Sequence, residues 1–358
     1  MPIQTLLHKT NLTKVDIIQL LQSTGDDEKS LFDISSEIKQ ANVGNTVYLR
    51  GLIELSNICE KDCYYCGIRK SNSAVHRYVI SEEEVLKAVR FAYEQRYGSV
   101  AIQSGEIQSP AFTEKINRIL LKTMKMTNGE LGITLSCGEQ TEETYRKWME
   151  AGASRYLLRI ETSNPELYRK LHPNDDIHRF ERRLEALEML KKTGYQTGTG
   201  VMIGLPLQTF ENLADDLLFM KQFDIDMCGM GPYIEHHETP LFAYKDSLMP
   251  LKERFNLSLK MIAILRILMP DINIAATTAL QTIEKNGREQ AIQIGANVLM
   301  PNITPRKYRD DYFLYENKPV SGQSREDDLK NLEKSLQVIG HRIGYSVQGN
   351  SKNFKKIN

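Results

Sequence analysis

The chain has 358 residues, a length that suits one barrel-type domain of about 250 residues with insertions and extensions. Lys and Arg together number 46, as do Asp and Glu, so no excess charge attracts the chain to nucleic acid or to an anionic membrane. With five cysteines, an odd number, and neither a signal peptide nor an apolar run of ~18–20 residues, we expect a cytoplasmic protein.

Two helices are predicted ahead of the first strand, at residues 13–23 and 30–41. Thr13 and Asp16 have the spacing of a capping box, and apolar residues follow at positions 17, 18, 20 and 21 on one helical face. We therefore expect residues 1–45 to form a helical extension that covers one end of the next domain.

The most unusual stretch, residues 56–67, follows a predicted strand at 47–55. It contains Cys59, Cys63 and Cys66, with the spacing C-x3-C-x2-C. Clusters that only transfer electrons are held by four cysteines, so three thiolates would hold three irons of a cubane and leave the fourth iron open to a ligand. Catalytic zinc sites likewise keep an open position. The alternatives are a three-ligand zinc site and three unrelated thiols.

The rest of the chain alternates strand-like and helix-like runs. Helices are predicted at 81–97, 111–126, 141–148, 179–192, 209–223, 251–268 and 287–293, with a short one after residue 164. Together with 47–55, the strand-like runs number eight, the others being 99–103, 131–135, 155–161, 196–205, 225–231, 272–278 and 296–300. This alternation predicts parallel strands, and their number predicts an α/β fold with a complete (β/α)8 TIM-type barrel over residues 46–315. Residues 316–358 are expected to form a C-terminal extension, with a helix at 325–340 and a basic, disordered tail from 351.

Polar side chains collect near the predicted C-terminal ends of these strands, where barrels of this type carry their active sites. They are Ser104, Gly105 and Glu106 after the second strand, Thr134 and Ser136 on the third, Arg159 and Glu161 on the fourth, Thr277 and Thr278 on the seventh, and Asn302 and Tyr308 after the eighth. Arg159 and Glu161 are two residues apart, so their side chains share one face of the strand. Because buried charges need partners, this pair either neutralises itself or recognises a ligand.

Several features have simpler structural explanations. Gly198 and Gly200 on the fifth strand are as compatible with tight packing as with function, and the glycine-containing segment after the second strand could be a turn. We interpret the histidines at 236 and 237 as loop residues, and Cys137 and Cys228 as packed thiols.

The cysteine motif has an aromatic residue, Tyr65, directly before its last cysteine, and so resembles the signature of the radical S-adenosylmethionine (SAM) enzymes. In that family the open iron of a [4Fe-4S] cluster chelates the amino and carboxylate groups of SAM, and an electron from the cluster cleaves SAM to a 5′-deoxyadenosyl radical. Later stretches resemble the HydE-type maturases of [FeFe]-hydrogenase, so that the resemblance covers roughly residues 45–315. These stretches are 66–72, 103–106, 156–162, 202–206, 276–279 and 300–305.

The resemblance implies two groups of site residues. The first group would bind the cofactors: Cys59, Cys63 and Cys66 the [4Fe-4S] cluster, the backbone beside Tyr65 the adenine, Ser104, Gly105 and Glu106 the amino group of SAM, and Ser136, Glu161 and Arg183 other parts of SAM. The second group would line an inner substrate cavity: Thr134, Arg159, Thr277, Thr278 and Tyr308. The guanidinium fork of Arg159 suits a substrate carboxylate.

The family's substrate is taken to be an iron–cyanide–carbonyl–cysteine complex made by a partner maturase, on the route to the diiron subcluster of the hydrogenase. The resemblance therefore implies partner maturases, the apo-hydrogenase and an external electron donor as partners. Some members carry a second cluster on three further cysteines near the C-terminus. This chain has no cysteine after Cys228, so we expect a single cluster.

Three alternatives remain open. Biotin synthase needs a second cluster held by cysteines on several strands, and the predicted fifth strand has none. Methylornithine synthase needs only one cluster, but the stretches 103–106 and 276–278 favour the maturase. An iron–sulfur carrier is the non-enzymatic alternative, and it would not cleave SAM.

Overall fold

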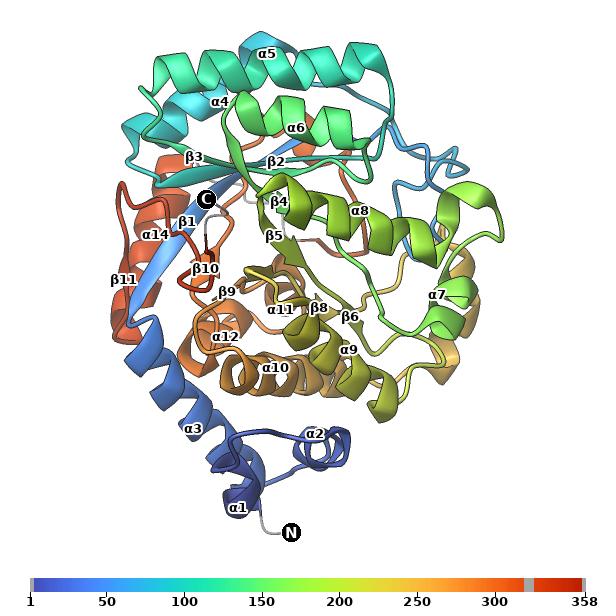
Figure 1. The fold of residues 1–358 in the computed structure, drawn as a ribbon, viewed down its shortest axis with the longest axis vertical. Helices are drawn as coiled ribbons and strands as arrows, with labels where there is room; N and C mark the ends of the chain where they lie inside the picture. The colour runs from blue at the N-terminus through green and yellow to red at the C-terminus, as the bar shows by residue number, and fades with distance from the viewer. Residues whose placement is uncertain (1–2, 319–324, 356–358) are drawn as a thin grey trace.

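The fold is α/β, and a computed structural model describes residues 3–318 and 325–355 (Figure 1). Its N-terminal part is helical, with α1 (Ile3–Leu7), α2 (Lys14–Leu21) and α3 (Asp26–Asn42). The capping box that opens α2 is confirmed, because the Thr13 side chain accepts a hydrogen bond from the Asp16 backbone and the Asp16 carboxylate accepts one from the Thr13 backbone. These helices pack against α9, α10 and α12, so they cover one side of the helical layer instead of an end of the domain.

The main sheet of the described residues is parallel throughout, and most neighbours in it are consecutive in the chain. Its order is β10-β1-β2-β3-β4-β5-β7-β9, with β11 added beside β1. The strands are β1 (Thr46–Ser56), β2 (Ser99–Ser104), β3 (Gly132–Ser136), β4 (Ala153–Leu157), β5 (Gln196–Thr199), β7 (Met227–Cys228), β9 (Asn273–Ile274), β10 (Val298–Leu299) and β11 (Arg342–Ile343). A separate parallel pair consists of β6 (Met202–Ile203) and β8 (Gly231–Pro232). The predicted alternation of parallel strands and helices is therefore confirmed.

The eight strands from β10 to β9 form a curved sheet, a half-barrel, inside a layer of helices (Figure 1). Two backbone hydrogen bonds each join one outer strand, β9 or β10, to a residue just outside the other. The backbone nitrogen of Asn297 donates to Ile274 O at 2.9 Å, and that of Ala276 donates to Val298 O at 3.0 Å. An isolated parallel bridge also joins Ala275 to Val298. The backbones beside β9 and β10 are therefore in direct contact.

The helices follow the sequence prediction closely. Those of the helical layer and the C-terminal part are α4 (Glu82–Glu94), α5 (Pro110–Met126), α6 (Glu142–Glu150), α7 (Pro165–Leu171), α8 (Phe180–Thr193), α9 (Phe210–Phe223), α10 (Leu251–Leu268), α11 (Thr278–Ile283), α12 (Gly287–Ile294), α13 (Arg306–Arg309) and α14 (Arg325–Val338), with 3₁₀ helices at Asp176–His178 and Pro240–Ser247. Buried apolar side chains of this layer and of the strands form one large core. No helix in the described part of the chain is long and apolar enough to cross a membrane.

Several strands end earlier than the sequence predicts. β4 stops at Leu157, four residues before Glu161, and the predicted strand 272–278 is reduced to β9. After β4 the regular pairing ends, and Glu161, which has a positive φ of 65°, makes an isolated parallel bridge to Val201. A regular strand does not continue through that conformation, so Arg159 and Glu161 lie on the segment that follows β4, whereas Ser104, Thr134 and Ser136 are on β2 and β3.

The prediction of a disordered tail is wrong for residues 351–355, while 356–358 lie outside the described residues. The Asn350 side chain accepts hydrogen bonds from Arg155 Nη1 at 2.6 Å and from Gln196 Nε2 at 2.9 Å. The backbone nitrogen of Ser351 donates to Gln196 Oε1 at 2.9 Å. Asn350 therefore supplies an acceptor to a buried guanidinium and a buried amide, and Ser351 supplies a donor to the same amide, because such groups need partners when water is excluded.

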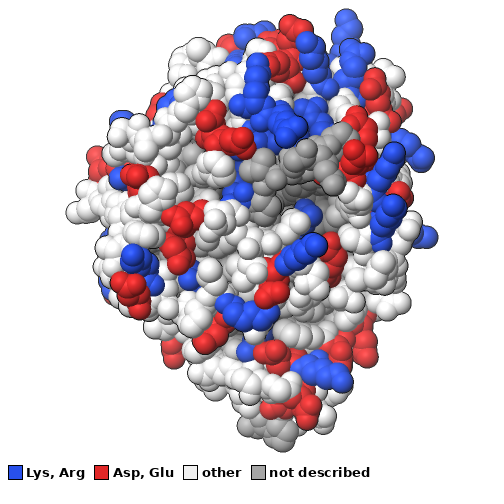
Figure 2. Space-filling model, turned by 180° about the vertical axis from the view of Figure 1, so that it is seen from behind, with Lys and Arg blue, Asp and Glu red and all other residues white. Residues whose placement is uncertain are grey.

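Charges of both signs are interspersed over the face shown in Figure 2, with a group of Lys and Arg toward its top. This agrees with the equal numbers of basic and acidic residues in the chain.

Candidate functional site

A cavity of about 360 Å³ opens where the strands end and extends down to Arg50 and Asn273 inside the sheet. Its volume falls in the range of small-molecule sites. All the predicted site residues line it except Tyr308. The sheet therefore brings together side chains that the sequence spreads over more than 200 positions.

The cysteine loop, residues 57–72, forms one wall of this cavity. Cys59, Cys63 and Cys66 all line it. Burial, followed by the neighbouring Cys59, raises the pKa of Cys63 to about 12, and burial also raises the pKa of Cys59 and of Cys66. The thiols therefore keep their protons in the absence of a metal. Binding of a metal cation releases these protons and forms the thiolate ligands.

The cysteine loop is held by hydrogen bonds within it and by contacts with two neighbouring segments. The Asp62 carboxylate accepts hydrogen bonds from the backbone and hydroxyl of Ser71 at 2.9 and 2.7 Å. The Asp62 backbone nitrogen donates to His178 Nε2 at 2.8 Å. A Cβ on Gly105, after β2, would lie 2.1 Å from Ile58 O, so the close approach of these two segments requires glycine.

A buried charge network lies behind the loop, at the ends of β2 and β3. Lys61 Nζ is 3.2 Å from Glu106 Oε1 and 2.9 Å from Glu139 Oε2. Glu139 is also paired with Arg183 Nε at 2.6 Å and with Arg182 Nε at 3.0 Å. Burial and the neighbouring Glu139 raise the pKa of Glu106, whereas at Glu139 the cations Arg183 and Lys61 outweigh burial and lower the pKa. The network therefore keeps the Glu139 carboxylate charged, and Glu106 is the carboxylate that lines the cavity.

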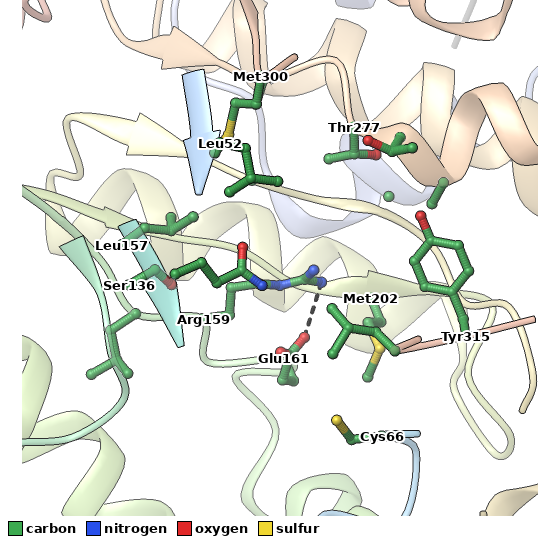
Figure 3. A pocket seen from close by; sticks show the side chains of 18 of the residues that line it. Leu52, Cys66, Ser136, Leu157, Arg159, Glu161, Met202, Thr277, Met300 and Tyr315 are labelled. Carbon is green, nitrogen blue, oxygen red and sulfur yellow. Dashed lines mark ion pairs between the residues drawn. The ribbon is translucent and has the colours of Figure 1, made fainter. Parts of the chain in front are cut away.

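Arg159 and Glu161 meet in the middle of the cavity, between Cys66 and Thr277 (Figure 3). Arg159 Nη2 is 3.0 Å from Glu161 Oε2 and donates to Val201 O at 2.9 Å. The pair lies at ion-pair distance but without hydrogen-bond geometry, and burial raises the pKa of Glu161 despite Arg159. Both side chains line the cavity, but they do not share a strand face as predicted, because β4 ends at Leu157 before either residue.

Three polar atoms in this region are buried without a hydrogen-bond partner: Ser104 Oγ, Arg159 Nε and Glu161 Oε2. Such atoms are rare in folded proteins, and each needs an explanation. All three belong to residues that line the cavity, and Glu161 has the unusual positive φ that is often found at functional sites. The arrangement suits a polar ligand that supplies the missing partners.

The inner part of the cavity is lined by polar and apolar side chains. Thr134 Oγ1 accepts a hydrogen bond from Arg155 Nε at 3.2 Å, and Thr277 donates to Met230 O at 3.4 Å. Thr277 and Thr278 are at the start of α11, which the sequence analysis did not predict. Leu52, Leu157, Met202 and Met300 supply the apolar wall (Figure 3).

Sequence reasoning missed several cavity residues with polar groups, among them Glu54, Tyr312, Tyr315 and Lys318. Lys318 donates to the buried carboxylate of Glu54, which also accepts from Asn302 Nδ2 at 2.9 Å. A signal for Glu54 was present, since it is an acidic residue near the end of a largely apolar strand. Lys318 had no such signal, because only the folded chain brings it to β1.

The structure does not bring Tyr308 to the cavity, contrary to the expectation. Its ring stacks on Tyr78 with the centroids 4.9 Å apart, and its hydroxyl donates to Glu84 Oε2 at 3.0 Å. Glu84 also belongs to the capping box of α4, which faces away from the cavity. Tyr308 therefore ties α13 to α4, while Tyr312 and Tyr315 line the cavity.

We predict that Tyr308→Phe leaves activity within about twofold of wild type, because the lost hydroxyl lies outside the cavity. The free energy of unfolding should fall by about 1 kcal/mol, the usual net contribution of one hydrogen bond. Denaturant unfolding and the activity assay described below measure the two effects. A large loss of activity in a stably folded variant would contradict this placement and show that Tyr308 contributes to the site.

From the sequence, Gly200 is as compatible with tight packing as with function, and Cys228 is interpreted as a packed thiol. A Cβ on Gly200 would lie 2.0 Å from Gly229 O, which supports tight packing at that position. The Cys228 thiol lies against Met220 Sδ at 3.6 Å and is a packed thiol. Among the described residues, no group of three His, Cys, Asp or Glu side chains converges as a single metal ion requires.

Known proteins resemble this chain along nearly its whole length. Residues 53–220 match the Radical SAM superfamily. The [FeFe] hydrogenase maturase subunit HydE of Thermotoga maritima is 43% identical over 329 residues, which cover 92% of this chain and 91% of that protein. The 3-methylornithine synthase of Methanosarcina acetivorans is 27% identical over 341 residues, covering 94% and 92%. A solved methylornithine synthase superposes with a TM-score of 0.81 at 24% identity over 97% and 98% of the two chains, which shows the shared fold.

Proposed function

Because this chain belongs to the radical SAM superfamily and is a relative of the HydE maturases, we propose that it is a radical SAM enzyme of [FeFe]-hydrogenase maturation. It cleaves SAM reductively at a [4Fe-4S] cluster to a 5′-deoxyadenosyl radical and acts in assembly of the diiron subcluster. The observation that carries this proposal is a single cavity, with three cysteines on one wall and partnerless polar groups within it.

The residues of the cysteine loop fit a cubane cluster. A single metal ion needs ligands that converge on one point, whereas a cubane takes one thiolate at each of three separate corners. Cys59, Cys63 and Cys66 would hold those corners and leave the fourth iron facing the cavity. When bound, the cluster would supply the electron that cleaves SAM.

The groups beside the loop fit SAM. Glu106, held by the backbone of Glu139 at 3.0 Å, presents a carboxylate for the ammonium group, with Ser104 and Gly105 alongside. Glu161, Arg183 and Ser136 would bind other polar parts of SAM, and the backbone beside Tyr65 would contact the adenine. The partnerless Ser104 Oγ and Glu161 Oε2 support this assignment.

The inner cavity would bind the substrate, which we propose to be an iron–cyanide–carbonyl–cysteine complex supplied by a partner maturase. Arg159 would orient its carboxylate, because a guanidinium fork matches that group in shape and charge. Thr134, Thr277 and Thr278 would offer hydroxyl groups, and the apolar wall would exclude water from a reactive radical. The apo-hydrogenase and an external electron donor would be further partners.

We also propose that the sheet is a complete (β/α)8 barrel. The bridge between Ala275 and Val298 and the two hydrogen bonds near it support closure between β9 and β10. In this proposal residues 46–315 are the barrel, 1–45 an N-terminal helical extension and 316–358 a C-terminal extension. A closed barrel leaves no strand edge exposed.

The function is tested with anaerobically reconstituted protein and a strong reductant. We expect 5′-deoxyadenosine to form from SAM, and we expect the protein to restore hydrogen evolution in an apo-hydrogenase maturation mixture that lacks only this component. Formation of methylornithine from lysine would instead assign it to the methylornithine synthases. Absence of SAM cleavage by cluster-loaded protein would favour the iron–sulfur carrier.

A further inference from the structure

We propose that Lys61 is a positioning residue that joins the cysteine loop to the carboxylates of Glu106 and Glu139 and so fixes the direction in which Glu106 meets the ammonium group of SAM. This inference rests on the proposed function, because SAM is the ligand that Glu106 would bind. Lys61 lies between Cys59 and Cys63 in the chain and contributes no cluster ligand.

The Lys61 side chain is fully engaged inside the protein. It is only 4% exposed, and its ammonium group contacts Glu106 Oε1, Glu139 Oε2 and the backbone oxygen of Ile177. Three acceptors match the three N–H donors of a lysine ammonium. A surface lysine would not be ordered in this way, so the side chain has a defined position on the loop.

Glu106 contacts the cysteine loop at three points. One is the ammonium group of Lys61, which is the only side-chain cation within 3.5 Å of the Glu106 carboxylate among the described residues. The Glu106 backbone nitrogen donates to Cys59 Sγ at 3.4 Å, and its backbone oxygen accepts from the Glu60 nitrogen at 2.8 Å. These two contacts fix the backbone of Glu106. Lys61 acts on the carboxylate itself and therefore fixes its rotation.

The neighbouring arginines cannot replace Lys61. Arg182 and Arg183 pair at 3.0 Å or less with Glu139, whereas Arg183 Nη2 is 3.9 Å from Glu106 Oε2. Without Lys61, the carboxylate of Glu106 would keep only the backbone donor of Glu139 on one oxygen. Its other oxygen would be free to rotate away from the ligand.

Net charge and geometry predict opposite effects for loss of Lys61. Removing a nearby cation should by itself strengthen the binding of another cation, such as the ammonium group of SAM. Loss of orientation should weaken it, because groups that orient the side chains ligating a metal typically contribute about 10- to 100-fold to metal affinity or activity, and Lys61 orients Glu106 in the same way. We expect the second effect, which is weaker binding of SAM.

The experiment compares Lys61→Met with wild-type protein, both full length and anaerobically reconstituted. Iron and sulfide are counted first, and the dissociation constant of SAM is then measured without reductant, so that no turnover occurs. We expect unchanged cluster content and a dissociation constant that rises by about 10- to 100-fold. The SAM-induced change in the electron paramagnetic resonance signal of the reduced cluster should require correspondingly more SAM.

Two further variants complete the test. Lys70→Met removes an exposed lysine of the same loop, and it should bind SAM as the wild type does. Lys61→Arg keeps the cation and should recover part of the lost affinity. If Lys61→Met loses its cluster, Lys61→Gln is measured in its place, because it keeps one polar donor.

Unchanged or tighter SAM binding in a cluster-loaded Lys61 variant would overturn the positioning role while leaving the proposed function intact. If the wild-type protein itself holds a cluster but neither binds nor cleaves SAM, the proposed function fails, and the role of Lys61 fails with it.

Discussion

Cys63→Ala is expected to lose the cluster and to form 5′-deoxyadenosine only at background rate. Cys63 lies between the other two cysteines of the motif and is 9% exposed, so no solvent ligand can easily take its place. Loss of an outer-shell partner already costs roughly 10- to 100-fold in metal affinity, and loss of a direct ligand should cost more. Iron and sulfide analysis and the yield of 5′-deoxyadenosine measure the effect.

The matched control is Cys137→Ala, which removes a thiol buried in the apolar core behind β3. It should keep its iron and its SAM cleavage, with at most a small loss of stability from the missing sulfur atom. Wild-type iron content in Cys63→Ala would contradict the assigned ligands. Zinc in place of iron in the anaerobic wild-type protein would contradict the cluster itself.

Arg159→Met is expected to abolish most substrate-dependent turnover while leaving the cluster in place. The variant would lose the proposed pair between Arg159 and the substrate carboxylate. Loss of one partner of a buried, hydrogen-bonded charge pair costs about 2–5 kcal/mol, which corresponds to roughly 30-fold to several thousandfold in kcat/KM. The hydrogenase maturation mixture reports this loss. The dissociation constant of SAM, measured separately, should change less, because among the proposed SAM ligands in the described residues only Glu161 pairs with the Arg159 side chain.

Arg159→Lys is the informative comparison, since lysine keeps the charge but loses the planar fork. We expect intermediate activity if the fork holds a carboxylate, and near wild-type activity if charge alone matters. Because Arg159→Met leaves Glu161 buried without a cation, thermal unfolding must be measured alongside. The double variant Arg159→Met with Glu161→Gln removes that unpaired charge; if it recovered full turnover, Arg159 would only neutralise Glu161.

The sequence alone determined the parts of this protein that depend on local patterns. The spacing of Cys59, Cys63 and Cys66 predicted an open three-ligand site, and strand-like runs alternating with helices predicted a parallel sheet. Such features succeed because chain periodicity and bond geometry fix them before tertiary contacts form.

Only the tertiary structure decided which distant groups share the cavity. Glu139 and Lys61 became parts of one charge network, and Lys318 reached Glu54 across 264 positions of the chain. Tyr308, near the predicted strand end, was turned toward α4 instead, while Ser351, in the tail that was predicted to be disordered, donates a hydrogen bond to the buried side chain of Gln196. These outcomes depend on where helices and loops pack around a curved sheet. A buried charge takes whichever partner that packing brings within reach, and linear spacing carries no record of it.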